Sequence, residues 1–374
     1  MRSAATTLVT LGAAASTVAA APNYVMYFDQ WHKDVLPDKS VTAGITHVIT
    51  AFATSDTFTS GASYTPFMPL DQIRALFDEG TKVCMAIGGW GDTAGFSAGA
   101  ATEESRKTYA KNVADTVQRL GYDCVDVDWE FPGGNGEDYK EIPNDQKVEE
   151  IETYPLLLAA IREAIGDMEL SIAVPGREVD MIAYTAEKVP EIDAIVDHIN
   201  VMTYDLMNRR DNATSHHTGI AASINSIDLY IERGFTPSKM ILGIPFYAKW
   251  FTTAQGADCT EPIGCPTAEL EAPDGTDTGL SGAITFEVAS FASEPDFVNA
   301  LENGQTDEES GGQWYWDSGK GVFWSWDTPE LIARKFEEIV KPKGLGGVMA
   351  WSLAQDSNDW SHIKAMSEGV KGMA

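Results

Sequence analysis

Eight short apolar runs, each rich in β-branched residues, alternate along this chain with longer amphipathic segments. Runs of this kind predict strands, and the amphipathic segments between them predict helices. Strand–helix alternation predicts a parallel sheet, and eight such units are the number that closes a (β/α)8 TIM barrel. A doubly wound open sheet is the alternative, but no G-x-G-x-x-G sequence follows the first run. The predicted strands are residues 24–28, 46–52, 82–87, 123–130, 170–174, 198–204, 240–246 and 347–353.

The segment between the seventh and eighth predicted strands is too long for a single helix. Its middle, residues 251–319, is rich in Gly, Pro and Asp. We predict a small α+β insertion at 251–319, placed between the seventh strand and the last barrel helix. The rest of residues 22–374 forms the barrel domain, with helices expected at 71–79, 104–120, 151–165 and 329–340.

Residues 1–21 have the composition of a secretory signal peptide. A positive start at Arg2 precedes an Ala-, Leu- and Val-rich run, and small residues near Ala20 and Ala21 offer a cleavage site. The run is shorter and less apolar than a membrane-spanning helix requires. We therefore predict a secreted, extracellular protein with no membrane partner.

The four cysteines suit an oxidising compartment. Cys259 and Cys265 flank a short loop and predict a local disulfide. Cys84 and Cys124 lie in predicted strands, which favours buried small side chains, although adjacent strands would let them pair. Asn212 begins an N-x-T sequon, a glycosylation site if its loop is exposed.

Acidic residues outnumber basic ones by 56 to 26, which gives a formal net charge of −30. That charge excludes nucleic acid as a partner and disfavours anionic membranes and acidic polysaccharides. A neutral ligand or substrate is the compatible class. Because the sequence contains no assembly motif, we expect a monomer.

The strongest chemical signal is the acidic run at residues 123–130, D-C-V-D-V-D-W-E. On a strand, Asp126, Asp128 and Glu130 face one side, and the apolar residues between them face the other. In a barrel the apolar side packs on the helices, so the carboxylates line the interior. Crowded, buried carboxylates hold shared protons with at least one raised pKa, as a general acid for glycosidic cleavage requires. Magnesium or calcium on these carboxylates is the alternative, but the run lacks the turn of an EF-hand loop.

Aromatic residues lie at the carboxyl ends of the predicted strands, where barrel enzymes place their active sites. Their rings can stack on the apolar faces of sugars, which fits a neutral polysaccharide. Any one of them is also suited to a packed core. They are Tyr27, Trp31, Phe52, Trp90, Tyr204, Tyr247 and Trp351.

The acidic run resembles the D-x-x-D-x-D-x-E signature of glycoside hydrolase family 18, the chitinases, and the likeness covers the whole mature chain. Gly88-Gly89-Trp90 resembles the family's third strand, and Met202-Thr203-Tyr204-Asp205 its sixth. The seventh and eighth strands are similar at residues 243–247 and 347–352. The whole chain resembles a secreted, fungal-type member, with an insertion that deepens the cleft.

The resemblance implies a role for each matching residue. Glu130 is the acid/base, Asp128 orients the substrate's acetamido group, and Asp126 shares the proton of Asp128. Tyr204 hydrogen-bonds the acetamido oxygen, and the nucleophile is the substrate's own N-acetyl carbonyl, with retention of configuration. The expected substrate-binding residues are Tyr27, Phe52, Gly89, Trp90, Met202, Asp205, Tyr247, Lys249 and Trp351.

Two residues depart from the family pattern. Ala86 replaces a serine that often supports the inner aspartate, and we expect Tyr27 to supply that support. Lys249 replaces a common arginine, which removes bidentate geometry at a sugar-binding position.

The resemblance implies hydrolysis of β-1,4-linked N-acetylglucosamine polymers, so chitin and its oligosaccharides are the expected partners. We expect no cofactor and no metal. A lectin-like binder on the same fold is one alternative, but such relatives typically lack the acid that Glu130 supplies. An endo-β-N-acetylglucosaminidase acting on N-glycans is the other, because it shares the same chemistry.

Overall fold

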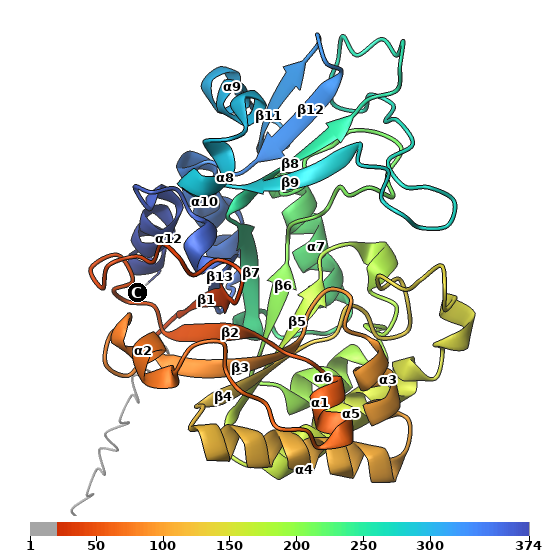
Figure 1. Ribbon diagram of the computed structural model, residues 1–374, viewed down its shortest axis with the longest axis vertical. Coiled ribbons are helices and arrows are strands. Elements are labelled where there is room, and N and C mark those ends of the chain that lie inside the picture. Colours follow the sequence, from red (N-terminus) through yellow and green to blue (C-terminus); the bar gives the residue numbers. More distant parts are fainter. Residues whose placement is uncertain (1–20, 374) are drawn as a thin grey trace, which may run out of the picture.

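The computed structural model describes residues 21–373. The predicted signal peptide therefore lies almost entirely outside the described residues. Eight parallel strands close into a barrel in the order β1-β13-β7-β6-β5-β4-β3-β2, so the (β/α)8 prediction is confirmed (Figure 1). The barrel strands are β1 (Asn23–Asp29), β2 (His47–Ala53), β3 (Lys82–Gly88), β4 (Cys124–Asp128), β5 (Glu169–Pro175), β6 (His198–Met202), β7 (Met240–Pro245) and β13 (Gly347–Trp351).

Each predicted strand overlaps an observed one, with one chemically important difference. The prediction that the fourth strand continues to residue 130 is wrong, because β4 ends at Asp128. Its pairing with β5 ends at Val127, and its pairing with β3 ends at Asp128. Glu130 therefore lies beyond the strand, in the loop that leaves the barrel mouth.

Most helices surround the barrel, whereas α8 (Val288–Phe291) and α9 (Pro295–Asn303) pack on the antiparallel sheet of the insertion (Figure 1). In α4 (Glu103–Leu120), Thr102 and Ser105 form a capping box, and Gly121 terminates the helix in the left-handed conformation. In α10 (Pro329–Lys335), Thr328 caps the first turn, and a π-helical turn, η4 (Phe336–Val340), continues it. The other helices are α1 (Asp56–Ser60), α2 (Leu70–Ala75), α3 (Ala94–Ala100), α5 (Glu150–Ile165), α6 (Val189–Ile195), α7 (Ile220–Glu232), α11 (Lys341–Lys343), α12 (Ser361–Lys371) and the 3₁₀ turns η1 (Asn144–Gln146), η2 (Glu178–Asp180), η3 (Pro237–Lys239) and η5 (Leu353–Gln355).

A second, antiparallel sheet stands above the barrel, in the order β10-β11-β12-β8-β9 (Figure 1). It begins four residues before the expected start of the insertion and ends well after residue 319. The first and last strands of this sheet along the chain pair with each other in its interior, as Trp250 does with Trp324. Its strands are β8 (Tyr247–Thr252), β9 (Ser281–Thr285), β10 (Gln305–Asp307), β11 (Gly312–Asp317) and β12 (Val322–Trp326).

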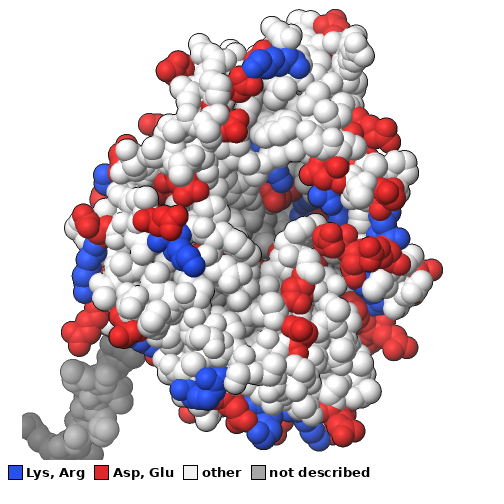
Figure 2. All heavy atoms as spheres, in the orientation of Figure 1, with Lys and Arg blue, Asp and Glu red and all other residues white. Residues whose placement is uncertain are grey.

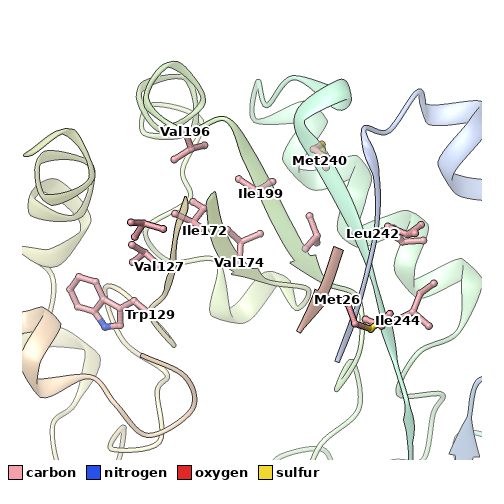
Figure 3. Close-up of a cluster of buried hydrophobic side chains, with 14 of the residues drawn as sticks. Met26, Val127, Trp129, Ile172, Val174, Val196, Ile199, Met240, Leu242 and Ile244 are labelled. Carbon is pink, nitrogen blue, oxygen red and sulfur yellow. The ribbon is translucent and has the colours of Figure 1, made fainter. Parts of the chain in front are cut away.

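Alternating side chains of the barrel strands divide the core into two layers. One layer packs between the strands and the helices, and includes Val127, Trp129 and Ile172 (Figure 3). The other fills the barrel interior and includes Tyr27 and Cys124. The alternation on β4 follows the pattern expected from the sequence, because the apolar members face the helices and the aspartates face the interior.

Two disulfides are present. Cys84 and Cys124 are direct register partners on β3 and β4, and they form a disulfide inside the barrel. This settles the alternative that the sequence left open. Cys259 and Cys265 form the second, in the insertion. Within residues 21–373, we find no helix long and apolar enough to span a bilayer.

Candidate active site

Asp126 is fully buried inside the barrel and is held by three hydrogen bonds. The Tyr27 hydroxyl donates to Oδ2 at 2.7 Å, the Ser171 hydroxyl to Oδ1 at 2.6 Å, and the Asn200 amide to Oδ1 at 3.1 Å. Burial raises the pKa of Asp126, and these donors oppose that rise by stabilising the carboxylate. The support expected from Tyr27 is present.

Ala86 and Ser171 explain how Asp126 keeps a serine hydroxyl. Both residues are register partners of Asp126, Ala86 on β3 and Ser171 on β5. The hydroxyl that is missing on one side of Asp126 is therefore supplied from the other side. Sequence reasoning missed Ser171 and Asn200, because only the strand register places them against Asp126.

Asp128, two residues further along β4, has the opposite environment. Its Oδ1 is buried and has no hydrogen-bond partner. Burial raises its pKa well above the ordinary range, and the neighbouring charges of Glu130 and Asp126 raise it further. Asp128 therefore keeps its proton to a higher pH than Asp126 does.

Glu130 lies where two arms of a cleft meet. Burial raises the pKa of Glu130 to about 8, and the negative charges of Asp205 and Asp180 add to the rise. A carboxyl group with this pKa is protonated at neutral pH, and its side chain is open to the cleft. Glu130 can therefore donate a proton to a bound ligand.

The cleft opens at the carboxyl end of the barrel, beneath the antiparallel sheet. Figure 2 shows it as a central hollow that is bordered by both acidic and basic side chains. The larger arm has a volume of about 620 Å³ and the smaller arm about 260 Å³. Both arms are lined by Trp90, Glu130, Met202, Tyr204 and Asp205.

The larger arm has an aromatic floor. The Trp351 ring stacks on Phe52 with centroids 5.5 Å apart, and Tyr27 lies 5.6 Å from Trp351 on another side. Gly89 does not line the cleft. A Cβ added at Gly89 would lie 2.6 Å from the Phe52 ring, so the glycine leaves room for that ring. Trp31 extends this arm outward and is 61% exposed.

Asp205, which lines both arms, lies at the centre of a cluster of polar side chains. The Tyr247 hydroxyl donates to its Oδ1 at 2.9 Å, and the Lys249 ammonium lies 3.0 Å from the same oxygen. Burial acts to raise the pKa of Asp205, but the Lys249 ammonium and the nearby His217 hold it below its usual range. Asp205 is thus a fixed negative charge beside the pair Asp128 and Glu130.

Tyr204 projects between these groups, with its ring 6.1 Å from that of Tyr247. Burial raises its pKa well above the usual range, and the nearby Asp128 raises it further. Tyr204 is therefore a neutral hydroxyl donor at neutral pH.

The structure brings the sequence-predicted residues together at the cleft, apart from Asp126 and Gly89, which lie just behind its lining. Sequence reasoning missed most of the smaller arm, because the other lining residues lie in segments without a motif. The missed residues are Phe131, Pro175, Gly176, Arg177, Asp180, Asn208, Arg209, Arg210, Asp277 and 281–283.

Asn212 is exposed, whereas Thr214 of its sequon is buried and accepts a hydrogen bond from the Cys265 amide. Among the described residues, we find no group of three or more His, Cys, Asp or Glu side chains arranged to hold a metal ion.

Comparisons with known proteins identify the family of this chain. The family profile described as Glycosyl hydrolases family 18 matches residues 23–356. Chitinase A1 of Niallia circulans is 29% identical over 307 residues, which cover 74% of this chain and 41% of that protein. Endochitinase 1 of Metarhizium robertsii is 27% identical over 288 residues, covering 74% of this chain and 62% of that protein. Mouse chitotriosidase-1 is 28% identical over 379 residues, which cover 93% of this chain and 75% of that protein.

Solved structures show the same fold. A chitinase from Rhizomucor miehei superimposes with a TM-score of 0.76 at 20% identity, covering 92% of this chain and 99% of the other. A Cycas revoluta GH18 chitinase, solved in complex with (GlcNAc)4, gives a TM-score of 0.70 at 22% identity, covering 92% of this chain and 98% of the other. Because the family profile spans nearly all of the described residues, this chain belongs to glycosyl hydrolases family 18.

Proposed function

We propose that this protein hydrolyses the β-1,4 linkages of chitin and its oligosaccharides with retention of configuration. The observation that carries the proposal is Glu130, a carboxyl group with a pKa of about 8 at the junction of the two arms. The aromatic floor of the larger arm supports a sugar polymer as the ligand. The chitinases among its relatives support N-acetylglucosamine as the sugar.

Catalysis begins with proton transfer from Glu130 to the glycosidic oxygen, which breaks the bond between that oxygen and the anomeric carbon. The acetamido carbonyl oxygen of the same sugar forms the new bond to the anomeric carbon and gives an oxazolinium ion. Glu130, now a carboxylate, takes a proton from water as the water oxygen bonds to the anomeric carbon and the bond from that carbon to the acetamido oxygen breaks. Two displacements at one carbon give retention.

Asp128 is suited to the acetamido N–H, because its buried Oδ1 has no partner within the protein. Tyr204 supplies a hydroxyl donor for the acetamido oxygen, and Trp351 provides the floor beneath the sugar. Asp205, fixed by Tyr247 and Lys249, is suited to holding the sugar's hydroxyl groups.

The test is hydrolysis of a defined N-acetylglucosamine hexamer, followed by NMR of the freshly released anomers. We expect β-anomeric products, and we expect Glu130→Gln to lose at least about a hundredfold in kcat, the smaller of the usual contributions of a general acid. Near-normal turnover by Glu130→Gln, or α-anomeric products, would refute the proposal.

We also place the protein outside the cell. The two disulfides are stable in oxidising compartments, and they agree with the signal peptide expected at residues 1–21. The monomeric state and glycosylation at Asn212 stay predictions, to be checked by light scattering and by mass spectrometry.

A further inference from the structure

Two loops that are far apart in sequence form a bridge behind Arg209 and Arg210, which line the smaller arm of the cleft. One loop follows β4 and contributes Tyr139, and the other belongs to the insertion and contributes Glu271. The Tyr139 hydroxyl donates to Glu271 Oε2, and Arg209 Nε donates to Glu271 Oε1 at 2.9 Å. The Arg210 guanidinium lies 3.9 Å from the centre of the Tyr139 ring.

The backbone of the insertion at Gly275 also approaches side chains of the loops after β4 and β6. A Cβ added at Gly275 of the insertion would lie 2.8 Å from Lys140 Cγ, and Arg209 Nη2 donates to the Gly275 carbonyl. The Glu271 side chain is only 8% exposed within this contact. A carboxylate this buried, held by an arginine and a tyrosine, fixes the bridge in place.

The order of the strands shows what the bridge encloses. β5 and β6 lie between β4 and β7 around the barrel. A contact between the loop after β4 and the insertion after β7 therefore encloses the barrel mouth over β5 and β6. The smaller arm lies there, lined by Arg177 after β5 and by Arg209 and Arg210 after β6. Arg209 and Arg210 also line a separate, outer hollow together with Tyr139 and Glu271. The two arginines, held by the bridge, therefore form the wall between the two spaces.

The chemistry of the two arms sets the direction of the substrate. Asp128 lines the larger arm and not the smaller one, whereas Glu130 lines both. The sugar whose acetamido group attacks lies over Asp128, in the larger arm. The leaving sugar lies beyond Glu130, in the smaller arm, and a leaving sugar carries the reducing end of the chain.

We propose that the bridge limits the smaller arm to a short reducing-end segment, so that the protein cleaves chitin chains close to their reducing end. This inference rests on the proposed function. The non-reducing part of the chain extends through the larger arm and out past the exposed Trp31. Interior cleavage of a long chain requires space beyond the bridge.

The experiment uses the full chain and an N-acetylglucosamine hexamer that carries ¹⁸O at its reducing-end anomeric carbon, with products analysed by mass spectrometry. We expect one short, ¹⁸O-labelled fragment to make up most of the labelled product. On a soluble chitin derivative, viscosity should fall slowly relative to the number of new reducing ends.

Tyr139→Ala combined with Glu271→Ala opens the bridge. We expect longer labelled fragments to increase severalfold and viscosity to fall faster for each bond cleaved. If the double variant unfolds, Tyr139→Ala alone takes its place with the same expected change, because it removes one side of the bridge and leaves Glu271 paired with Arg209. Glu269→Ala is the matched control, because Glu269 is exposed on the same loop.

Labelled fragments of many lengths from the wild-type protein, or short fragments without the label, would overturn this inference alone. An unchanged product pattern in a folded double variant would do the same. A wild-type protein that releases no fragment would overturn the proposed function, and this inference with it.

Discussion

Removing the Ser171 hydroxyl should destabilise the protein by an amount that depends on pH. In Ser171→Ala, the buried Asp126 carboxylate loses a donor at 2.6 Å. A hydrogen bond to a charged group contributes about 1.5–3 kcal/mol, and one to a neutral group about 0.5–1.5 kcal/mol. The variant should therefore be less stable than the wild type by about 1.5–3 kcal/mol where Asp126 is ionised. Where Asp126 is protonated, the loss should be only about 0.5–1.5 kcal/mol.

The sign follows from the pKa of Asp126. Burial raises that pKa above its value in the unfolded chain, so the stability due to this group is full at low pH and is lost as the pH rises. Losing the Ser171 donor raises the pKa of Asp126 in the folded protein further, so the folded protein loses more stability as the pH rises. The difference between variant and wild type should thus be larger at high pH.

Urea unfolding of both proteins at about pH 4 and about pH 8 measures this difference directly. Ser238→Ala is the control, because Ser238 is exposed and should show no pH-dependent change. Equal destabilisation by Ser171→Ala at both pH values, or a loss below about 0.5 kcal/mol at the higher one, would show that Ser171 does not stabilise an ionised Asp126.

Three further predictions concern the cleft. The kcat/KM should fall as the pH rises above about 8, because Glu130 then loses the proton that it donates; a profile that keeps rising would contradict the pKa given above. Gly89→Ala should cost about 1–3 kcal/mol and raise KM, since its φ is +92° and the new Cβ meets the Phe52 ring; thermal unfolding and steady-state kinetics on the hexamer would detect both. A chelator should leave the rate of hexamer cleavage unchanged, and loss of activity that returns with added metal would refute a metal-free mechanism.

The sequence was sufficient to predict the barrel, because its signal is repeated eight times and each repeat is local. Composition and periodicity within a few residues identify a buried strand, and the number of strands then limits how the sheet can close. The end of β4 and the extent of the antiparallel sheet could not be predicted in this way. Both depend on which strands pair, as Trp250 and Trp324 do across the insertion.

The residues of the candidate site also fall into two groups, those with a local sequence signal and those without one. The residues at 126, 128 and 130 were identified because they lie in one continuous run with a strand's alternation. Ser171 and the bridge between Tyr139 and Glu271 come from segments that only the folded chain brings together. Such residues carry no local signal, since a lone serine or glutamate is compatible with almost any exposed position.

The contrast between Asp126 and Asp128 explains how one strand can hold two aspartates in different protonation states. Asp126 receives three hydrogen bonds and Asp128 Oδ1 receives none, so the proton favours Asp128 in the free protein. A bound acetamido N–H would supply the donor that Asp128 lacks and would lower its pKa. The resulting negative charge beside Glu130 raises the pKa of the acid at the moment when the glycosidic oxygen lies next to it. Substrate binding would therefore secure the proton that the first step consumes, and the acetyl group would act both as nucleophile and as the trigger for this shift.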